Sequence, residues 1–155
     1  MRLRDLDDID RAILTHLQKD GRLSNVELAG LVSLSESACL RRVRNLEDGG
    51  IIDGCVVLLN AAACGRPGTV FVQVALDRQQ QEDLQAFEEA VKEVPEVMEC
   101  YLMSGEQDFM LRVIVKDATD YERIHTQHLT RLPGVARVHS GFALRTVLKK
   151  TEIPL

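Results

Sequence analysis

The feature that most constrains the fold of this chain is an internal repeat in its second half. Phe71 and Phe109 stand at equal distances before Pro95 and Pro133, so the two segments superpose at a shift of 38 residues (109 − 71). In each segment, an apolar run that fits a strand leads into a helical stripe that the proline ends, and a second strand follows. Two such interleaved βαβ units predict a four-stranded antiparallel sheet with both helices on one face, the ferredoxin-like split βαβ.

Such a sheet keeps one bare face. We expect its strands over residues 69–76, 97–103, 109–115 and 135–148. A sheet that contains residues such as Val70, Val72, Met110 and Arg112 cannot leave a wide apolar surface in water. A second copy of the chain, paired by two-fold symmetry, would cover this surface, so we expect a homodimer.

The first fifty residues predict three helices. Ser24 and Glu27 form a capping-box pattern at the start of one helix, Ser35 caps the next, and a glycine pair at 49–50 ends it. An earlier apolar stripe that begins behind Asp7 predicts a first helix, which covers the apolar faces of the other two. A short turn between two such helices is typical of a helix-turn-helix, whose second helix enters the DNA major groove.

The third of these helices has two distinct sides. They are separated by advancing about 100° per residue with Val43 at the centre of the buried side. The inward side holds Cys39, Leu40 and Leu46. The outward side holds Ser37, Ala38, Arg41 and Asn45, with Arg42 and Arg44 on its flanks. Small residues permit close approach to a groove and arginines bind phosphate or guanine, although composition alone fits a solvated basic surface equally well.

The charge balance sets a condition on DNA binding. The 155 residues are 45% hydrophobic and 28% charged with a net charge of −5, and neither half of the chain is basic. The arginines of the third helix instead gather on one face, while acidic residues gather around positions 5–10. One such face binds DNA weakly, so we expect specific affinity to need several copies in an oligomer.

No residue pattern predicts a cofactor, a metal site or catalysis. The four cysteines include no CxxC pair, and His125 and His128 lack a third ligand at helical spacing. The chain has neither a glycine-rich phosphate loop nor a persuasive Ser/His/Asp arrangement, which disfavours an amino-acid-processing enzyme with a domain of this fold. The charged first ten residues and the lack of a long apolar run predict no signal peptide and no membrane span, hence a cytoplasmic protein with no membrane partner.

A linker is expected between the two halves. Residues 51–59 are apolar and rich in β-formers, which predicts a strand that leaves the helical domain. Residues 60–68 contain small residues, one proline and two glycines, a composition typical of a hinge. The expected division is a domain at 1–60 that includes the exit strand, a linker at 61–68, and a second domain at 69–155.

The loop 104–108 is a candidate ligand site. It joins the second and third strands, and a second Ser140-Gly141 pair lies near the end of the fourth. Amides and hydroxyls there suit the carboxylate of a free amino acid, and Asp108 suits its ammonium group. The alternative is a plain hairpin turn, in which a glycine has positive φ and the Asp caps its own backbone. The residues alone favour this alternative.

Both halves of the chain resemble one known family. The stretch IDRAILTHLQKDGRLSNVELAGLVSLSESACLRRVRNLEDGGII is similar to the DNA-binding segment of the Lrp/AsnC (feast/famine, leucine-responsive) regulators, and Gly105-x-x-Asp108-Phe109 resembles a turn of their RAM domain. The resemblance implies an α+β architecture, with a winged-helix-like helix-turn-helix domain joined to a ferredoxin-like βαββαβ (RAM) domain. It also implies that an amino acid or a related small molecule binds at contacts between dimers.

Residue pattern and resemblance together give two sets of candidate site residues. The expected DNA contacts are Ser24, Asn25, Ser35, Ser37, Ala38, Arg41, Arg42, Arg44 and Asn45. The effector lining that the resemblance implies is Leu102, Met103, Ser104, Gly105, Asp108 and Ala118, with Gly141, Phe142 and Ala143 from a facing chain. The chain departs from the family pattern at Ser33 in the turn, at Asn45, and at Glu106-Gln107 in the loop, so its DNA target and its effector are not implied by the resemblance.

The expected function is a sequence-specific transcriptional regulator of amino-acid metabolism, modulated by a small effector, an amino acid, that binds between dimers. Its partners are double-stranded promoter DNA and further copies of itself, a dimer that assembles into an octamer or a larger particle. No cofactor is expected besides the effector. The alternative is a sequence-tolerant DNA-organising protein of the same fold, whose helices bind through phosphates.

Overall fold

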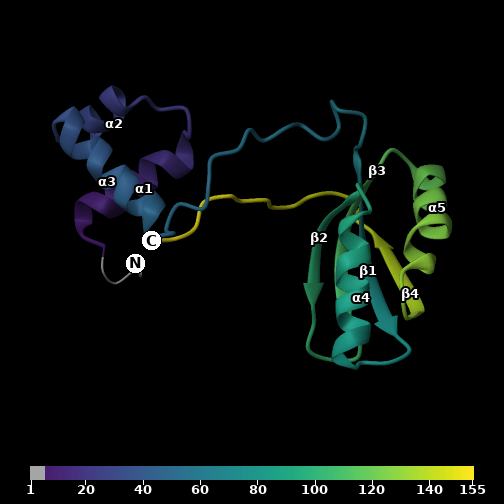
Figure 1. Cartoon of the computed structure of the whole chain (residues 1–155). Helices are drawn as coiled ribbons and strands as arrows, with labels where there is room; N and C mark the ends of the chain where they lie inside the picture. Colours follow the sequence, from purple (N-terminus) through teal and green to yellow (C-terminus); the bar gives the residue numbers. More distant parts are fainter. Residues whose placement is uncertain (1–5) are drawn as a thin grey trace. The chain divides into compact units, whose positions relative to one another are not determined.

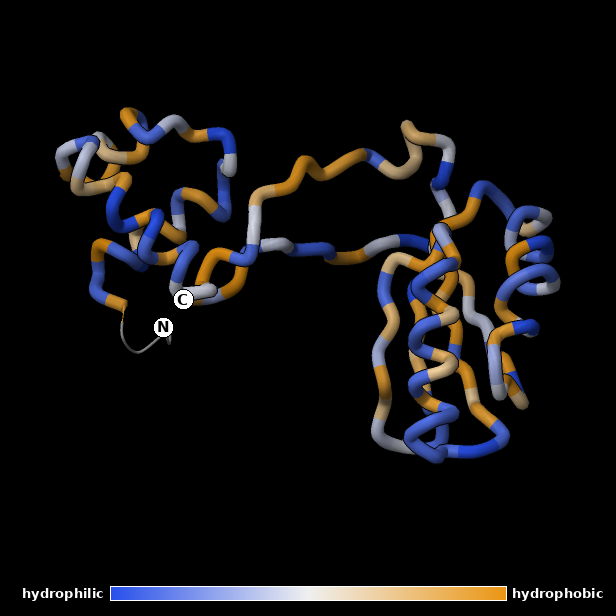
Figure 2. The backbone as a smooth tube through the Cα atoms, in the orientation of Figure 1, coloured by the Kyte–Doolittle hydropathy of each residue, from blue (hydrophilic) through white to orange (hydrophobic). Residues whose placement is uncertain are grey.

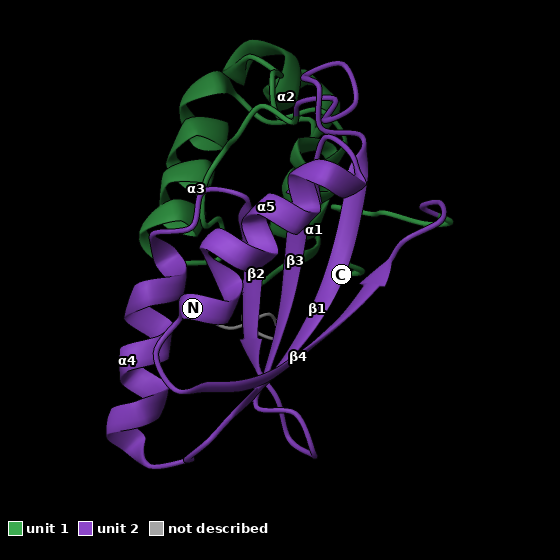
Figure 3. Ribbon diagram, turned by 90° about the vertical axis from the view of Figure 1, so that its right-hand side faces the viewer, with its two compact units in different colours: residues 1–58, 147–155 green, residues 59–146 purple. Residues whose placement is uncertain are grey.

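The chain forms two compact units, which Figure 1 shows in a computed structural model. The structure describes residues 6–155, so the sequence-based prediction about a signal peptide lies in part outside it. Unit 1 comprises residues 1–58 and 147–155, and unit 2 comprises residues 59–146 (Figure 3). The chain therefore leaves unit 1, forms unit 2 and returns. Its last nine residues group with the helices of unit 1, whereas the sequence assigned them to the second domain.

Unit 1 is built on three capped helices. They are α1 (Asp8–Lys19), α2 (Asn25–Leu31) and α3 (Glu36–Asp48). Asp7, Ser24 and Ser35 each accept a hydrogen bond from the amide three residues further along, and Glu27 completes the capping box of α2. The three helices share one core, whose best-buried members are Ile13, Leu28, Ala29, Cys39 and Leu46. The predicted helical arrangement is confirmed.

The turn between α2 and α3 passes through a left-handed residue. Ser33 has φ of 55°, which makes it the one residue other than glycine with positive φ within 6–155. The Leu34 amide donates to the Ala29 carbonyl at 2.9 Å and so closes the end of α2. A left-handed conformation costs a residue with a side chain about 1–2 kcal/mol. The turn thus keeps its shape at the expense of local strain.

Unit 2 is a sheet with two helices. Its elements are β1 (Gly68–Leu76), α4 (Gln81–Lys92), β2 (Val97–Leu102), β3 (Phe109–Val115), α5 (Ala118–Gln127), the 3₁₀ turn η2 (Leu129–Arg131) and β4 (Val135–Phe142). The four strands lie in the order β2-β3-β1-β4, and every neighbouring pair is antiparallel. The predicted split βαβ topology is therefore confirmed.

The helices cover one face of this sheet (Figure 3). Val70 and Val72 are both 0% exposed and share a core with Phe87 of α4 and Ile124 of α5. The rings of Phe87 and Phe109 stack with centroids 4.3 Å apart. Because successive side chains of a strand point to opposite faces, the register of β1 and β3 decides what remains on the open side.

The open face of the sheet differs from the one expected. The prediction that Val70 and Val72 contribute to it is wrong, since both turn toward the helices and are fully buried. Alternation places the intervening residues on the open side, which mixes aromatic, aliphatic and charged groups. The open-face residues include Phe71, Glu99, Tyr101, Met110 and Arg112. Glu99 and Arg112 form an ion pair at 2.7 Å, so this face is less apolar than the sequence suggested.

Two predicted strand segments do not form within residues 6–155. The expected exit strand, residues 51–59, belongs to no strand, and β4 ends at Phe142 rather than Leu148. A strand needs a neighbour for its N–H and C=O groups, and neither segment finds one among the described residues. Figure 2 shows the hydrophobic run in the first segment, where Val56 is 83% exposed.

The predicted hinge contains an ordered turn at its start. The side chain of Asn60 accepts a hydrogen bond from the Ala63 amide at 3.0 Å. Further along, Arg66 lies 3.6 Å from Asp120, and Arg123 links Asp120 to the buried Glu96 at 2.9 and 2.8 Å. Burial alone would raise the pKa of Glu96, but the hydrogen bond from Arg123, a backbone hydrogen bond and the charges of Arg123 and Arg66 together hold that pKa below its usual value. The end of the hinge is thus held on unit 2 by a chain of charges.

Candidate nucleic-acid interface and ligand site

The recognition helix α3 starts at a braced junction with α2. Asn25 donates from Nδ2 to the Glu36 carbonyl at 2.8 Å, and Ser35 Oγ accepts from an amide of the first turn of α3 at 3.3 Å. Ser24 donates from its hydroxyl to Glu27 at 2.7 Å. Three of the expected DNA contacts, Ser24, Asn25 and Ser35, therefore hold the start of the two helices. Their contact with DNA stays a prediction.

The buried side of α3 is rotated from the one expected. Cys39 and Leu46 are 0% and 1% exposed, whereas Val43 is only half-buried, which moves the centre of the buried side by about 50° from Val43. The same rotation carries Leu40 away from the core and brings Arg42 toward it. The prediction that Leu40 points inward is wrong, because it is 38% exposed. The neighbouring helices, and not α3 itself, set this centre.

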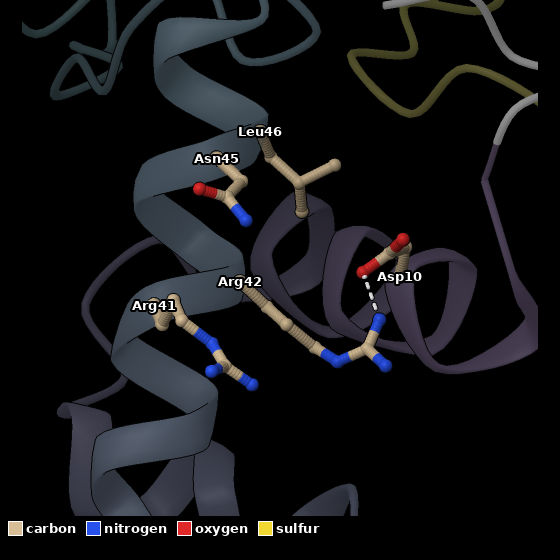
Figure 4. A pocket seen from close by; sticks show the side chains of 5 residues that line it. All are labelled: Asp10, Arg41, Arg42, Asn45 and Leu46. Carbon is tan, nitrogen blue, oxygen red and sulfur yellow. Dashed lines mark hydrogen bonds and ion pairs between the residues drawn. The ribbon is translucent and has the colours of Figure 1, made fainter.

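Arg42 faces α1 (Figure 4). Its Nη1 atom lies 2.7 Å from Asp10 Oδ1 and 2.8 Å from Asp7 Oδ2. Hydrogen bonds to Asp10 and then Asp7 raise the pKa of Arg42, while the Asp10 amide and then Arg42 hold the pKa of Asp7 below its usual value. One guanidinium is thus balanced by two carboxylates. In this structure Arg42 joins α3 to α1, and its contact with DNA stays a prediction.

The outward side of α3 carries two free arginines. Within residues 6–155, the side chains of Arg41 and Arg44 form no hydrogen bond or ion pair, and both residues are exposed with Ser37 and Asn45. Ala38 is half-buried at the border. Arg41 and Asn45 also line a hollow of about 280 Å³ with Asp10, Arg42 and Leu46 (Figure 4). An unpaired guanidinium can form a forked contact with phosphate or with guanine O6 and N7.

Asp108 is deeply buried, with 7% of its surface exposed. Among the described residues of the expected effector lining, it is the one buried polar side chain. Its Oδ2 atom accepts from the Leu76 amide at 2.7 Å. Its own amide donates to Val74 at 2.9 Å, and its carbonyl accepts from Met103 at 2.8 Å. The aspartate thus caps a backbone amide, as the hairpin interpretation expects, but the amide belongs to β1 and not to its own loop. Oδ1 has no hydrogen-bond partner in residues 6–155.

Apart from the half-buried Gln107, the rest of the loop is open to solvent. Leu102 and Met103 are 57% and 43% exposed, and Ser104 is exposed beside Gly105. Gly105 has φ of 130°, a conformation that a residue with a side chain rarely adopts. These residues form one half of the expected lining, with their apolar and polar groups uncovered.

The other expected lining residues lie at the opposite end of the sheet. The strand register places Phe142 beside Val70 and Val115 beside Gly68, at the start of β1. Asp108 is instead hydrogen-bonded to Leu76, at the end of β1. Ala118 follows directly on β3 at that same far end, together with Gly141, Phe142 and Ala143. A sheet of this length separates the two groups by about 20 Å. Ala118 therefore does not meet the loop of its own chain.

The far group rests on a support that sequence reasoning missed. The Tyr121 hydroxyl and the Ser140 hydroxyl share a short hydrogen bond, and the Tyr121 ring meets the Phe142 ring edge-on with centroids 5.2 Å apart. In the sequence Tyr121 is only one member of an apolar helical stripe, so its hydroxyl gave no separate signal. Asp7 and Asp10 were also missed as partners of Arg42, because only the packing of α1 on α3 brings them together.

Comparison with known proteins decides the family. Residues 6–47 match the model of the AsnC-type helix-turn-helix domain, and residues 69–153 match that of the Lrp/AsnC ligand binding domain. The chain belongs to the Lrp/AsnC family. It is 46% identical over 150 residues to the leucine-responsive regulatory protein of Escherichia coli, covering 97% of this chain and 92% of that protein. It is 43% identical over 153 residues to the Bkd operon transcriptional regulator of Pseudomonas aeruginosa, covering 99% of this chain and 100% of that protein.

Solved structures of Lrp/AsnC relatives have the same fold. A transcriptional regulator from Neisseria meningitidis, solved as a complex with L-methionine, superposes with a TM-score of 0.91 at 34% identity over 96% of each chain. An AsnC family regulator from Agrobacterium tumefaciens superposes with a TM-score of 0.90 at 37% identity, covering 96% of this chain and 97% of that one. The predicted α+β architecture, a helix-turn-helix unit followed by a βαββαβ unit, is confirmed.

Membership of the Lrp/AsnC family makes this chain a DNA-binding transcriptional regulator with a ligand-binding domain, and not an enzyme. Within residues 6–155, no three His, Cys, Asp or Glu side chains gather in a way that could hold a metal ion. In the same part of the chain, every helix is too short or too polar to cross a bilayer.

Proposed function

We propose that this regulator binds its promoters sequence-specifically through α3 and that a free amino acid modulates this binding. The observation that carries the proposal is the outward pair Arg41 and Arg44, unpaired among the described residues on a helix whose third arginine, Arg42, is held by Asp7 and Asp10. Neutralising Arg42 within the protein leaves a narrow positive face rather than a broad basic patch. A narrow face suits the reading of base edges more than the wrapping of DNA.

We further propose that the functional particle is a homodimer that assembles into an octamer or a larger particle. Two features of the single chain support self-association. The open face of the sheet exposes Phe71 and Tyr101 at 46% and 54%, and the exposed apolar residues 56–59 pair with no strand within residues 6–155. Dimers also present two copies of α3, which compensates for the net charge of −5 on each chain.

The effector is proposed to bind where two dimers meet. The loop with Asp108 and the end of β4 with Phe142 lie at opposite ends of one sheet, so a site that uses both groups needs a second chain. Asp108 Oδ1 would accept the ammonium group, while the amide of Gly105 and the hydroxyl of Ser104 would bind the carboxylate. Control of genes for amino-acid metabolism, in the cytoplasm, is part of this proposal. The choice of an amino acid as effector is supported by the relative from Neisseria meningitidis, whose structure is a complex with L-methionine.

A thermal-shift screen against the twenty amino acids tests the effector proposal. A true effector at a hundredfold excess over its Kd stabilises the folded protein by about 2.7 kcal/mol. The same amino acid should change the affinity of the protein for a promoter fragment that it binds. If none of the twenty amino acids raises the melting temperature, the amino-acid part of the proposal is overturned. The proposal of DNA binding is then judged separately.

Competition with random DNA separates this function from sequence-tolerant DNA organisation. A sequence-specific regulator prefers its site by about 10³-fold or more over random duplex at physiological salt. From a DNA-organising protein, unlabelled random DNA and unlabelled promoter DNA should displace labelled promoter DNA equally well. Equal loss would overturn the proposal of specific reading.

A further inference from the structure

The last residues of the chain are bound to α1 through one glutamine. Gln18 Nε2 donates to the Ile153 carbonyl at 3.1 Å, and the Ile153 amide donates to Gln18 Oε1 at 2.6 Å. A primary carboxamide offers one donor and one acceptor side by side, as a neighbouring strand does. Gln18 therefore recognises the backbone of residue 153 and holds it in a fixed direction.

The tail meets a groove that is already apolar. A cavity of about 740 Å³ in unit 1 is lined by the last turns of α1, by residues 51–58 and by the tail. Its apolar wall includes Leu14, Leu17, Ile51 and Ile52. This wall is part of the helical unit itself and needs no contribution from the sheet of unit 2.

Alternate residues of the tail line this cavity. Thr151, Ile153 and Leu155 all contribute to its wall, whereas the two residues between them do not. This spacing is what an extended peptide shows when one of its faces lies on a surface. Ile153 is nonetheless 69% exposed, so the groove is only partly filled and the tail can exchange.

We propose that residues 151–155 are a reversible strap, a peptide ligand carried by the chain for the groove of its own helix-turn-helix unit. Residues 144–150 join the strap to the end of β4. Docking requires neither DNA nor effector. The further step, that the strap transmits effector occupancy near Phe142 to α1, rests on the proposed function.

Hydrogen exchange on the full chain without DNA and without amino acids tests the docking. Removal of residues 151–155 should speed amide exchange several-fold in the last turns of α1, and leave β1 and β3 unchanged. Gln18→Ala should give the same pattern in a chain of full length. The matched control is Gln85→Ala, because Gln85 is an exposed residue of α4 whose side chain forms no hydrogen bond in the described residues. It should change nothing near α1.

Addition of a synthetic Thr-Glu-Ile-Pro-Leu peptide to the truncated protein should restore slow exchange, whereas a peptide of the same composition in scrambled order should not. Unchanged exchange in α1 after both truncation and Gln18→Ala would overturn the strap. Restoration by the scrambled peptide would overturn recognition of this segment. These outcomes do not depend on DNA binding, so they are distinct from a failure of the proposed function.

Cross-linking decides whose tail occupies the groove. Gln18→Cys and Ile153→Cys are placed in a chain whose exposed Cys55 and Cys64 are serine, first together and then singly on two chains that are mixed, and a short bis-maleimide joins the two thiols. A cross-link within the doubly substituted chain supports the proposal. A cross-link that forms only between the singly substituted chains would assign the groove to a neighbour's tail and overturn an own-chain strap, and no cross-link in either case would overturn the docking.

Discussion

The DNA-facing surface of unit 1 and the expected effector lining of unit 2 are assembled in different ways. Arg41 and Arg44 come from one helix, and the residues that brace that helix lie within the same fifty residues of the chain. The effector lining comes from the loop at Asp108 and from the end of β4, which sit at opposite ends of one sheet. The first surface is complete in a single chain, and the second is divided between two places.

This difference indicates which unit depends on assembly. A capped helix presents its outward arginines whether or not another chain is present, because its own caps and core hold it. A lining that uses residues from both ends of the sheet is complete only when a neighbouring chain supplies one of the two groups. The comparison therefore predicts that defects in α3 act locally, whereas defects around Asp108 act both on unit 2 and on what unit 2 assembles.

The largest expected effect follows from Asp108→Ala. This change leaves the buried Leu76 amide without an acceptor, and unit 2 should lose about 1–3 kcal/mol of unfolding free energy. Denaturant unfolding measures the loss. Asp108→Asn keeps a carbonyl acceptor and should preserve most of the stability, but it should abolish the thermal shift caused by an amino acid. A full ligand shift in the Asn variant would remove Asp108 from the amine-binding role.

The three arginines of α3 should separate into two kinds. Arg41→Ala should weaken DNA binding and reduce the slope of log affinity against log salt by about 0.9 if Arg41 neutralises one phosphate. Arg42→Ala should instead lower the melting temperature of unit 1, because it leaves the half-buried Asp10 unpaired, with a smaller change in the slope. Binding titrations at several salt concentrations, with melting curves of each variant, measure both. The reverse pattern would contradict the assignment of Arg42 to α1.

A smaller effect should come from the strained turn. Ser33→Gly relieves a left-handed conformation and should stabilise unit 1 by about 0.5–1 kcal/mol after the extra entropy of the unfolded chain is subtracted. Ser37→Gly, in the first turn of α3, is the matched control and should destabilise by roughly 0.5–1 kcal/mol. Thermal unfolding of the two variants compares them. If both destabilise, the turn at Ser33 is not strained.

The smallest effect concerns pH and unit 1. The Ser24 hydroxyl and then the Ser24 amide hold the pKa of Glu27 below its usual value of 4.5. The folded-state pKa is lower than the unfolded one, so the stabilisation is present above pH 4.5 and is lost as pH falls through the folded value. Glu27→Gln should flatten this part of the acid-unfolding curve for α2. An unaltered curve would show that the capping box does not contribute to acid stability.

The sequence was most informative where structure is local. The caps at Asp7, Ser24 and Ser35 require only neighbouring residues, and the repeat of two βαβ segments restricts the topology of the sheet to very few choices. It was less informative about side-chain direction. Leu40 and Arg42 were misassigned because the centre of the buried side of α3 depends on where α1 and α2 pack.

The candidate site divides along the same line. The outward position of Arg41 follows from helical periodicity, since it lies about 160° from Val43 around the helix. Arg42 and Arg44 each lie about 100° from Val43, on opposite flanks, so only the observed buried centre at Cys39 and Leu46 decides that Arg44 is outward and Arg42 is not. The binding of Asp108 to the Leu76 amide could not be read from a turn motif, because the two residues are far apart in the chain and meet only across the sheet. The expected exit strand failed to form for a related reason, since a strand exists only with a partner.

By itself, the sequence determined the order of the helices and strands that form, the caps of the three helices of unit 1 and the family to which the chain belongs, because these depend on short-range pattern. Only the tertiary structure decided which arginine is free, which valines are buried and where the last residues dock. Each of these depends on contacts between residues that are distant in the chain, such as Arg42 with Asp7 and Gln18 with Ile153. Such contacts are set by packing and register, which periodicity along the chain does not specify.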